Sequence, residues 1–443
     1  MKVAVVGGGV AGLTAAWRLL GAGHEPIVLE AGPRAGGVIQ TSTVDGFVRE
    51  HAANGFLTGD DDGAAALCAE LGVPVVEAAA AAKHRWIYRG GELHPVPASP
   101  VAFARSRLLT WRGKLAALGE PLRPGRDAAV AGDESMRDFA TRRFGAEAAA
   151  ALIGPVVTGV YAADAADISL AAGFPKLAEL DAAGGMVRGM LAKRRGGAKR
   201  PRPRLAAPLG GMGAIPAALA ARLGDRVRLD APVARVVPTA DGVTLDGPGG
   251  GRFDAVVLAV PAPAARALVA DAIPALAAAL TSAVAAPAAV VYLGFDAGVV
   301  PPDRDGFGLL VCAGEAVRVL GVVFESTIYP GRAPAGARLF RMIYGGGRDP
   351  AAAALDDAAL LAQARGDLAR VLGVTANPRH ASIVRWQAAL AQYRVGHLDR
   401  AAQWDALARP HRVVLCGAPY HGVAVNACIA DGRRAAAAVA ALA

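Results

Sequence analysis

Three glycines near the start of the chain, Gly7, Gly9 and Gly12, have the spacing GxGxxG between the apolar run KVAVV and the helix-like stretch LTAAWRLLGAG. In such a turn the first glycine permits a sharp bend, the second lets the backbone approach a pyrophosphate, and the third lets the helix pack close to the strand. Unpaired N–H groups at the helix N-terminus then bind the phosphates. Glu30 ends the next apolar run, where it can accept a hydrogen bond from a ribose hydroxyl. The pattern predicts a strand, turn, helix and strand that bind a dinucleotide.

The residues after Glu30 indicate which dinucleotide is bound. The run EAGPRAGGVIQT resembles an extension found in the flavin-dependent amine oxidase superfamily, in which an arginine and a glycine pair continue the phosphate and ribityl site. In this chain these residues are Arg34, Gly36 and Gly37. The resemblance favours FAD over NAD.

A second glycine-punctuated turn lies near the other end of the chain. The stretch GAPYHGVAVNACIADGRR follows the apolar run RVVLC and leads into AAAAVAALA, which predicts a strand, a loop and a helix that begins near Val425. A helix N-terminus aimed at a flavin ring would stabilise the negative charge that develops there on reduction. A helix that only packs on the sheet would explain the apolar tail, but not the glycines and Asn426 before it.

Several further segments, in the same order along the chain, resemble the protoporphyrinogen oxidase family. They are GPVVTGVYAADAADISLAAGFPKL, PLGGMGAIPAALAARLG, RDGFGLLV, AQYRVGHL and GVAVNACIADGR. The resemblance covers essentially the whole length. It implies an α/β fold with a Rossmann-like FAD-binding domain of the amine oxidase type, a mixed-sheet substrate domain and a helical domain. It also implies non-covalently bound FAD, a porphyrinogen substrate, dioxygen as the electron acceptor and hydrogen peroxide as a product.

The resemblance also implies roles for individual residues. The cofactor contacts fall on Gly7, Gly8, Gly9, Gly12, Glu30, Ala31, Arg34, Gly36, Gly37, Val38, Asn54, Gly55, Val233, Ala418, Val423, Ala424 and Val425. The substrate contacts fall on Arg85, Gly159, Phe307, Leu310 and Ile343. A porphyrinogen is a large apolar macrocycle with carboxylates at one edge, so apolar walls and a cation such as Arg85 suit it. No residue stands out as a general base, and catalysis is expected to depend on positioning and on the electrostatics of the flavin site.

The same residues leave several activities open. The favoured reaction is oxidation of protoporphyrinogen IX to protoporphyrin IX in haem biosynthesis, and oxidation of coproporphyrinogen III would use the same pocket. A flavin amine oxidase usually places a lysine near the flavin from the later half of the chain, whereas the last lysine here is Lys199. A carotenoid desaturase-like enzyme would not need RDGFGLLV or AQYRVGHL. A non-catalytic flavin or tetrapyrrole carrier is the alternative from outside enzymes.

The charge balance bears on partners. The chain has 443 residues and a formal net charge of +9, which admits nucleic acid, an anionic membrane or an acidic substrate. No helix-turn-helix, zinc-finger or RNA-binding signature accompanies the charge, so we expect no nucleic-acid partner. The segment RGMLAKRRGGAKRPRPR, residues 188–204, carries only basic charges and is either a solvated loop or a contact with anionic lipid. With the apolar helices expected around it, the segment predicts peripheral attachment to the inner face of the cytoplasmic membrane.

Other features predict location and domain organisation. The four cysteines form no CxxC pair, which predicts no metal site and a reducing compartment, the cytoplasm by default. Met1 and Lys2 lead directly into the first strand, so we expect no signal peptide. The uncharged residues 274–295 contain Pro287 and are interpreted as a short helix and a buried strand, not as a membrane span. Residues 226–261 alternate short β-type runs with turn residues, which predicts a small antiparallel meander that returns to the main sheet. The segment RWIYRGGELHPVP is interpreted as a break between alanine-rich helical stretches. A homodimer is left open. The predicted domains are an FAD-binding domain (1–78, 205–262 and 408–443), a substrate domain (79–97 and 263–407) and a helical domain (98–204).

Overall fold

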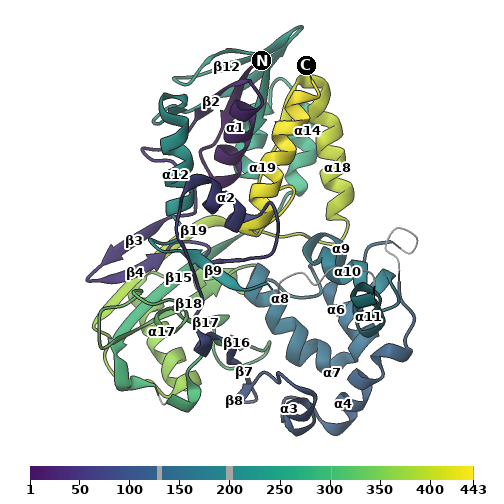
Figure 1. The fold of residues 1–443 in the computed structure, drawn as a ribbon, viewed down its shortest axis with the longest axis vertical. Coiled ribbons are helices and arrows are strands. Elements are labelled where there is room, and N and C mark those ends of the chain that lie inside the picture. Colours follow the sequence, from purple (N-terminus) through teal and green to yellow (C-terminus); the bar gives the residue numbers. More distant parts are fainter. Residues whose placement is uncertain (127–131, 196–202, 301, 443) are drawn as a thin grey trace.

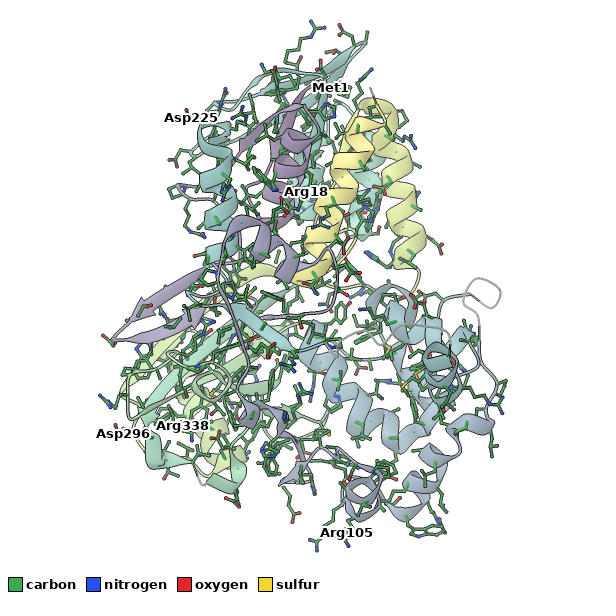
Figure 2. The ribbon with its side chains drawn as sticks, in the orientation of Figure 1. Met1, Arg18, Arg105, Asp225, Asp296 and Arg338 are labelled. Carbon is green, nitrogen blue, oxygen red and sulfur yellow. The ribbon has the colours of Figure 1, made fainter. Side chains whose placement is uncertain are left out.

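The fold is taken from a computed structural model, which describes residues 1–126, 132–195, 203–300 and 302–442 (Figure 1). One end of the molecule holds both termini, a parallel sheet and its helices. The other end holds a large mixed sheet and, beside it, a group of helices. Side chains fill the interior between these layers (Figure 2).

The first sheet is parallel throughout. Its strand order is β10 (Val227–Arg228), β2 (Glu25–Leu29), β1 (Lys2–Val6), β14 (Ala255–Leu258) and β20 (Val413–Leu415). Alternate residues of β1 enter two different cores, because successive side chains of a strand point to opposite faces. Val3 and Val5 pack with helices α1 (Val10–Gly21), α12 (Ala214–Leu223) and α19 (Val425–Ala440), whereas Ala4 and Val6 pack with α13 (Ala262–Val269), α14 (Pro274–Ala279) and α18 (His397–Ala408). Helices therefore cover both faces of this sheet, as continuous apolar strands require.

Helices α1 and α19 lie side by side although they come from opposite ends of the chain (Figure 1). Gly432 makes this packing close, since a Cβ atom there would lie 2.6 Å from the carbonyl oxygen of Ala11. Both helices start at the side of the sheet that faces the rest of the molecule (Figure 1). The predicted strand, turn, helix and strand at the N-terminus and the helix beginning at Val425 are both confirmed.

Smaller sheets accompany the parallel sheet and the large mixed sheet. Strands β11 (Arg235–Thr239), β12 (Gly242–Asp246) and β13 (Gly251–Phe253) form the predicted antiparallel meander, which returns to the parallel sheet at β14. Strand β3 (Thr41–Val44) pairs with β4 (Phe47–Glu50). Strand β9 (Leu205–Pro208) lies between β5 (Phe56–Leu57) and β6 (Val75–Glu77), so chain segments far apart in sequence meet beside α2 (Ala64–Leu71).

The large sheet has the order β19 (His380–Ala391), β15 (Ala285–Asp296), β18 (Ala337–Gly345), β17 (Gly321–Phe324), β16 (Gly308–Val311), β7 (Arg85–Arg89) and β8 (Glu92–Pro95). Only the β16–β7 pair is parallel within it. The segment RWIYRGGELHPVP, interpreted from the sequence as a break between helices, is a hairpin that extends this sheet. Residues 274–295 form a short helix and the buried strand β15, as predicted.

The two faces of the large sheet have different partners. Helix α17 (Asp357–Leu372) covers the face that carries Phe340, Met342 and Tyr344. The alternating residues Arg341 and Ile343 of β18 therefore point to the opposite face. That face looks toward the parallel sheet, because Val323, opposite Arg341 on β17, packs against the core around α1.

The described part of residues 98–204 is helical. It contains α3 (Pro100–Arg105), α4 (Trp111–Leu118), α6 (Met136–Phe144), α7 (Ala146–Ala148), α8 (Gly154–Tyr161), α9 (Leu170–Gly173), α10 (Pro175–Ala182) and α11 (Met186–Arg195). A buried ion cluster of Arg143, Glu120 and Asp181 joins several of these helices. Within the predicted basic segment, residues 196–202 lie outside the described residues. No helix in the described ranges has both the length and the apolar composition needed to span a bilayer. The domain boundaries stay a prediction.

The packing of α19 on α1 predicts opposite effects for two glycine-to-alanine changes inside helices. Gly432→Ala adds a methyl group against Ala11 and Thr14 and should lower the free energy of unfolding by about 1–3 kcal/mol. Gly366→Ala in α17 is the matched control, because a Cβ there meets nothing within 4 Å, and it should raise stability by about 0.5–1 kcal/mol. Thermal unfolding of both variants measures the difference. Equal effects of the same sign would contradict the packing.

Candidate functional site

The GxGxxG turn has two closely packed glycines and one open glycine. Gly7 has a φ of +106°, and a Cβ atom on it would overlap the carbonyl group of Ala259. A Cβ on Gly12 would overlap the carbonyl oxygen of Gly7. A Cβ on Gly9, in contrast, would meet nothing within 4 Å. The first turn of α1, whose N-cap is Gly9, has no side-chain cap. Within the described residues no side chain of the N-cap competes for its first backbone N–H groups, and the space beside Gly9 is open, which is the arrangement that binds a pyrophosphate.

The carboxylate of Glu30 is oriented by the backbone around it. It accepts hydrogen bonds from the N–H groups of Gly8 at 2.8 Å and Gly32 at 2.9 Å. Each oxygen retains acceptor capacity for a hydroxyl group. The backbone carbonyl of Glu30 also accepts from Ala231 at 2.9 Å, which places the segment containing Val233 beside the end of β2. The predicted ribose acceptor and Val233 therefore lie in one region.

The extension after Glu30 folds back onto the glycine turn. The N–H of Gly36 donates to the carbonyl of Gly8 at 2.7 Å, and Gly37 lies so close to Gly9 that a Cβ on it would be 3.1 Å from the Gly9 Cα. The exposed Arg34 guanidinium donates to the carbonyl of Gly37 at 3.2 Å and braces this loop. Ala31 and Val38 are exposed on it.

The C-terminal loop is held by residues that the sequence analysis did not place in the site. The Tyr393 hydroxyl donates to the carbonyl of Ala418 at 2.7 Å. His397 stacks on the Tyr393 ring at 3.7 Å between centroids, and its Nε2 bonds to the carbonyl of Tyr420 at 2.8 Å. Burial lowers the pKa of His397 to about 4, so at neutral pH the imidazole is uncharged and donates from Nε2. The motif AQYRVGHL thus supports the loop that leads to Val423 and α19.

Helix α19 begins without a capping side chain. Its N-cap is Ala424, whose side chain makes no hydrogen bond to the backbone N–H groups of the first turn, which starts at Val425. Asn426 is turned away from this role, since its side chain donates to the carbonyl of Leu57 and accepts from the N–H of Ala64. The residue ties α19 to β5 and α2. An uncapped helix start is available to a ligand group that carries negative charge.

Asn54 and Gly55 lie at the centre of the molecule, between β4 and β5. Among the described residues, Nδ2 of Asn54 is buried and has no well-formed hydrogen bond. Gly55 touches Tyr329, whose hydroxyl group would overlap a Cβ at this position. A buried donor without a partner is costly, so a group bound beside Asn54 would stabilise the folded chain.

The five predicted substrate residues meet on one side of the large sheet. Arg85 pairs with Gly308 across β7 and β16, and its guanidinium lies 5.1 Å from the centre of the Phe307 ring. Gly159 of α8 lies against Leu310, since a Cβ there would be 2.8 Å from the Leu310 Cδ2. Leu310 is opposite Gly321, and Gly321 is opposite Ile343. The result is a partly buried apolar wall with a cation at one edge.

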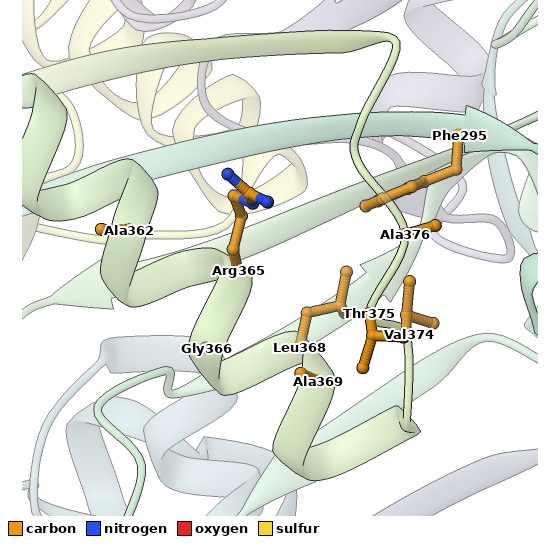
Figure 3. A pocket seen from close by; sticks show the side chains of 9 residues that line it. All are labelled: Phe295, Ala362, Arg365, Gly366, Leu368, Ala369, Val374, Thr375 and Ala376. Carbon is orange, nitrogen blue, oxygen red and sulfur yellow. The ribbon is translucent and has the colours of Figure 1, made fainter.

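These observations test whether the chain fits a flavin dinucleotide. The described residues bring together two uncapped helix starts, an oriented carboxylate, an open glycine and an unpaired buried amide. These features come from both ends of the chain and from residues 52–55. They fit an elongated ligand with phosphates at one end and a hydrogen-bonding ring at the other. A further surface hollow of about 390 Å³ lies between α17 and residues 374–376 (Figure 3) and is lined by none of the predicted site residues.

Comparisons with known proteins agree with this fit. The family described as flavin containing amine oxidoreductase matches residues 10–440. The chain belongs to this family. It is an FAD-dependent oxidoreductase, and FAD is its cofactor.

Three relatives cover nearly all of the chain. The coproporphyrinogen III oxidase of Mycobacterium leprae is 34% identical over 97% of this chain and 96% of its own length. Protoporphyrinogen oxidase 1 of Spinacia oleracea, a chloroplast protein, is 30% identical over 98% of this chain and 83% of its own length. A solved structure from Exiguobacterium sp. 255-15, provisionally named a protoporphyrinogen oxidase, superposes with a TM-score of 0.86 at 23% identity, covering 99% of this chain and 98% of that one. The predicted fold class is confirmed.

The open position of Gly9 gives a direct test of the cofactor site. Gly9→Val adds a side chain whose Cβ meets no protein atom within 4 Å and suits the extended backbone there, so the fold should persist. The added atoms fill the space in front of α1, and purified protein should lose most of its bound FAD, measured as flavin absorbance per protein.

Gly21→Ala, at the other end of α1, is the control, since a Cβ there also meets nothing within 4 Å. It should retain the flavin. Full flavin content in Gly9→Val would place the phosphates elsewhere.

Proposed function

We propose that this protein oxidises a porphyrinogen to a porphyrin with bound FAD and dioxygen. The observation that carries the proposal is the apolar wall of Phe307, Leu310 and Ile343 with Arg85 at its edge, on the sheet face that looks toward the FAD-binding end. A flat, apolar macrocycle with carboxylates at one edge matches this wall. The printed names of the mycobacterial and spinach relatives support the same substrate class.

The chain's own residues bind and orient the substrate. FAD supplies the acceptor for the C–H hydrogen and its electron pair, and dioxygen takes up both, together with one proton, as hydrogen peroxide. Arg85 pairs with a propionate and fixes which edge of the ring faces the sheet. Leu310 and Ile343 exclude water from the methylene bridge, and Gly159 allows α8 to approach Leu310 closely. Orientation of this kind contributes a large share of a rate enhancement.

Two substrates are candidates. Protoporphyrinogen IX is favoured by the motifs of the sequence, and coproporphyrinogen III is named in the relative at 34% identity. The two differ in the number of propionates. The experiment supplies each porphyrinogen in air to the holoprotein and follows porphyrin fluorescence and peroxide. Turnover of either above the protein-free rate supports the proposal, and the faster one identifies the substrate. Retained flavin without turnover of either would favour an amine, a carotenoid or a carrier role.

Arg85 should affect binding more than chemistry. Arg85→Gln removes the charge that pairs with a propionate, and because the hydrogen bond is charge-assisted, KM should rise by roughly 10-fold while kcat changes little. The control is Arg105→Gln at the outer edge of the helical part (Figure 2), which should leave both constants unchanged. An unchanged KM in Arg85→Gln would remove Arg85 from the substrate site.

We also propose that the helical part rests on an anionic membrane surface. On α4, Trp111, Leu115 and Leu118 follow one another at helical spacing and are 66%, 58% and 65% exposed. Leu122, in the short 3₁₀ turn after α4, is 85% exposed. Arg112 lies beside the Trp111 ring, at 5.5 Å. An exposed apolar stripe with neighbouring cations is typical of helices that lie in the membrane interface.

The stripe predicts binding to lipid vesicles that contain phosphatidylglycerol. Wild-type protein should sediment with them, and Leu115→Ser with Leu118→Ser should reduce the bound fraction several-fold. Leu398→Ser, an equally exposed leucine on α18, should have no effect. Wild-type protein that stays in the supernatant would contradict the membrane proposal and leave the oxidase proposal intact.

A further inference from the structure

Two buried glutamates, Glu50 and Glu325, lie beside the loop of residues 52–55, and their carboxylates differ in the hydrogen bonds that they accept. Glu50 is ion-paired with Arg332 at 2.5 Å, and its carboxylate also accepts from the Thr41 hydroxyl and the Met212 N–H. Glu325, only 1% exposed, has no hydrogen bond to either carboxylate oxygen within the part of the chain that the structure describes. A buried carboxylate without hydrogen bonds is unusual enough to require an explanation.

Several polar groups around Glu325 also lack hydrogen-bond partners among the described residues. The Arg341 Nε lies 4.0 Å from the Glu325 Oε1, too far for a hydrogen bond, and is buried without a partner among the described residues. The other end of the Arg341 guanidinium donates to the carbonyl of Ala52. Within the described ranges, the Asn54 Nδ2 and the Tyr329 hydroxyl are also buried and have no hydrogen-bond partner. Asn54 lies near enough to favour the ionised form of Glu325, although it makes no well-formed bond to it.

These groups supply complementary donors and acceptors. Arg341 and Asn54 offer N–H donors, Glu325 offers two acceptor oxygens, and the Tyr329 hydroxyl can do either. A separation of 4.0 Å between a cation and a carboxylate is the kind that one water molecule bridges. Buried water molecules typically bind where two to four polar groups would otherwise be unpaired.

Glu325 also lies between the two halves of the proposed site. It follows Phe324, whose N–H donates to the carbonyl of Phe307 on the substrate wall. Arg341 is on the same face of β18 as Ile343, two residues away. On the other side, Asn54 and Gly55 belong to the predicted cofactor loop. A proton on Glu325 would therefore be close to both partners of the reaction.

We propose that Glu325, with Arg341, Asn54 and Tyr329, forms a water-bridged proton site that takes up the proton leaving the substrate. The inference rests on the proposed function. When a C–H hydrogen leaves a porphyrinogen with its electron pair, the lone pair of a ring nitrogen forms a C=N double bond, the N–H bond breaks with its electrons kept on the nitrogen, and a proton is released. The bridging water passes this proton to the Glu325 carboxylate, which later releases it to solvent. Glu325 acts through the water, which the N–H groups of Arg341 and Asn54 and the Tyr329 hydroxyl hold in place.

The surrounding charges suit this role. Burial raises the pKa of Glu325 above its ordinary value, and Glu50 raises it further, whereas Arg341 and Arg332 lower it. The pKa is therefore raised above the usual carboxyl range, and a carboxylate with a raised pKa accepts a proton more readily. The pKa of the Tyr329 hydroxyl is well above its ordinary value because of burial, so this group stays protonated and can donate to the water.

The first test is spectroscopic and needs no turnover. The infrared C=O band of protonated carboxyl groups is titrated with pH in the holoprotein, for wild type, Glu325→Gln and Arg341→Gln. Wild type should retain this C=O band above the pH at which ordinary carboxyls ionise, and Glu325→Gln should lack the band at such a pH. Arg341→Gln should retain the band to a higher pH than wild type, because a cation next to the carboxyl group is lost. Identical titrations of wild type and Glu325→Gln would overturn the proposal.

Thermal unfolding tests whether Glu325 titrates in the folded protein, independently of any folding defect in the variant. Because the folded pKa of Glu325 is raised, the folded state keeps a proton that the unfolded state releases above about pH 4.5. This contribution to stability falls as pH rises from there to the folded pKa. The Tm of Glu325→Gln relative to wild type should therefore increase with pH across that window. A constant difference would mean that Glu325 does not titrate in the folded protein.

The kinetic test separates this proposal from the proposed function. In Glu325→Gln, kcat should fall by roughly 10²-fold and lose its acidic pH limb, with KM nearly unchanged. Glu92→Gln on β8, an exposed glutamate, should keep the wild-type profile. A wild-type pH profile in Glu325→Gln would overturn the proton role. Wild type that carries the titrating band but oxidises no porphyrinogen would refute the proposed function and leave the proton site standing.

Discussion

The parallel packing of α1 against α19 is the constraint on which the rest of the site depends. Both helices start on the same side of the parallel sheet, and both starts lack capping side chains. Their unpaired N–H groups supply partial positive charge at two points that a single elongated anionic ligand can span. The close contact of Gly432 with Ala11 holds the two helices in this arrangement. Because α1 and α19 come from residues far apart in the sequence, an FAD bound at both helix starts would bridge the two segments.

The second sheet completes the site by facing this pair of helices. One face of the large sheet packs against α17 through Phe340, Met342 and Tyr344. The other face carries Arg341 and Ile343, and it continues through Gly321 and Leu310 to the strand of Arg85. Alternation along the strands therefore separates a structural face from a functional one. The stack of His397 on Tyr393 fixes the loop before α19, so the position that we propose for the cofactor ring depends on both halves of the molecule.

The parts of this arrangement that the sequence predicted are local in the chain. The glycine turn, Glu30, the meander and the helix at Val425 each depend on residues close together, and all are found where expected. The β7–β8 hairpin was misinterpreted because it has few residues and its sheet partners come from β16. Glu325 could not be found from the sequence, since its surroundings combine β18 with a loop 289 positions earlier in the chain. Tyr393 and His397 belonged to a recognised motif, but their contacts with residues 418–420 needed the folded chain.

The central claim is that one bound FAD accepts electrons from a porphyrinogen held on the large sheet. The most direct measurement mixes the holoprotein with either porphyrinogen in the absence of oxygen and follows the visible absorption of the flavin. We expect the absorption to bleach in a single rapid phase that saturates with substrate, and to return when air is admitted. Flavin that keeps its full absorption in the presence of both porphyrinogens would contradict the account.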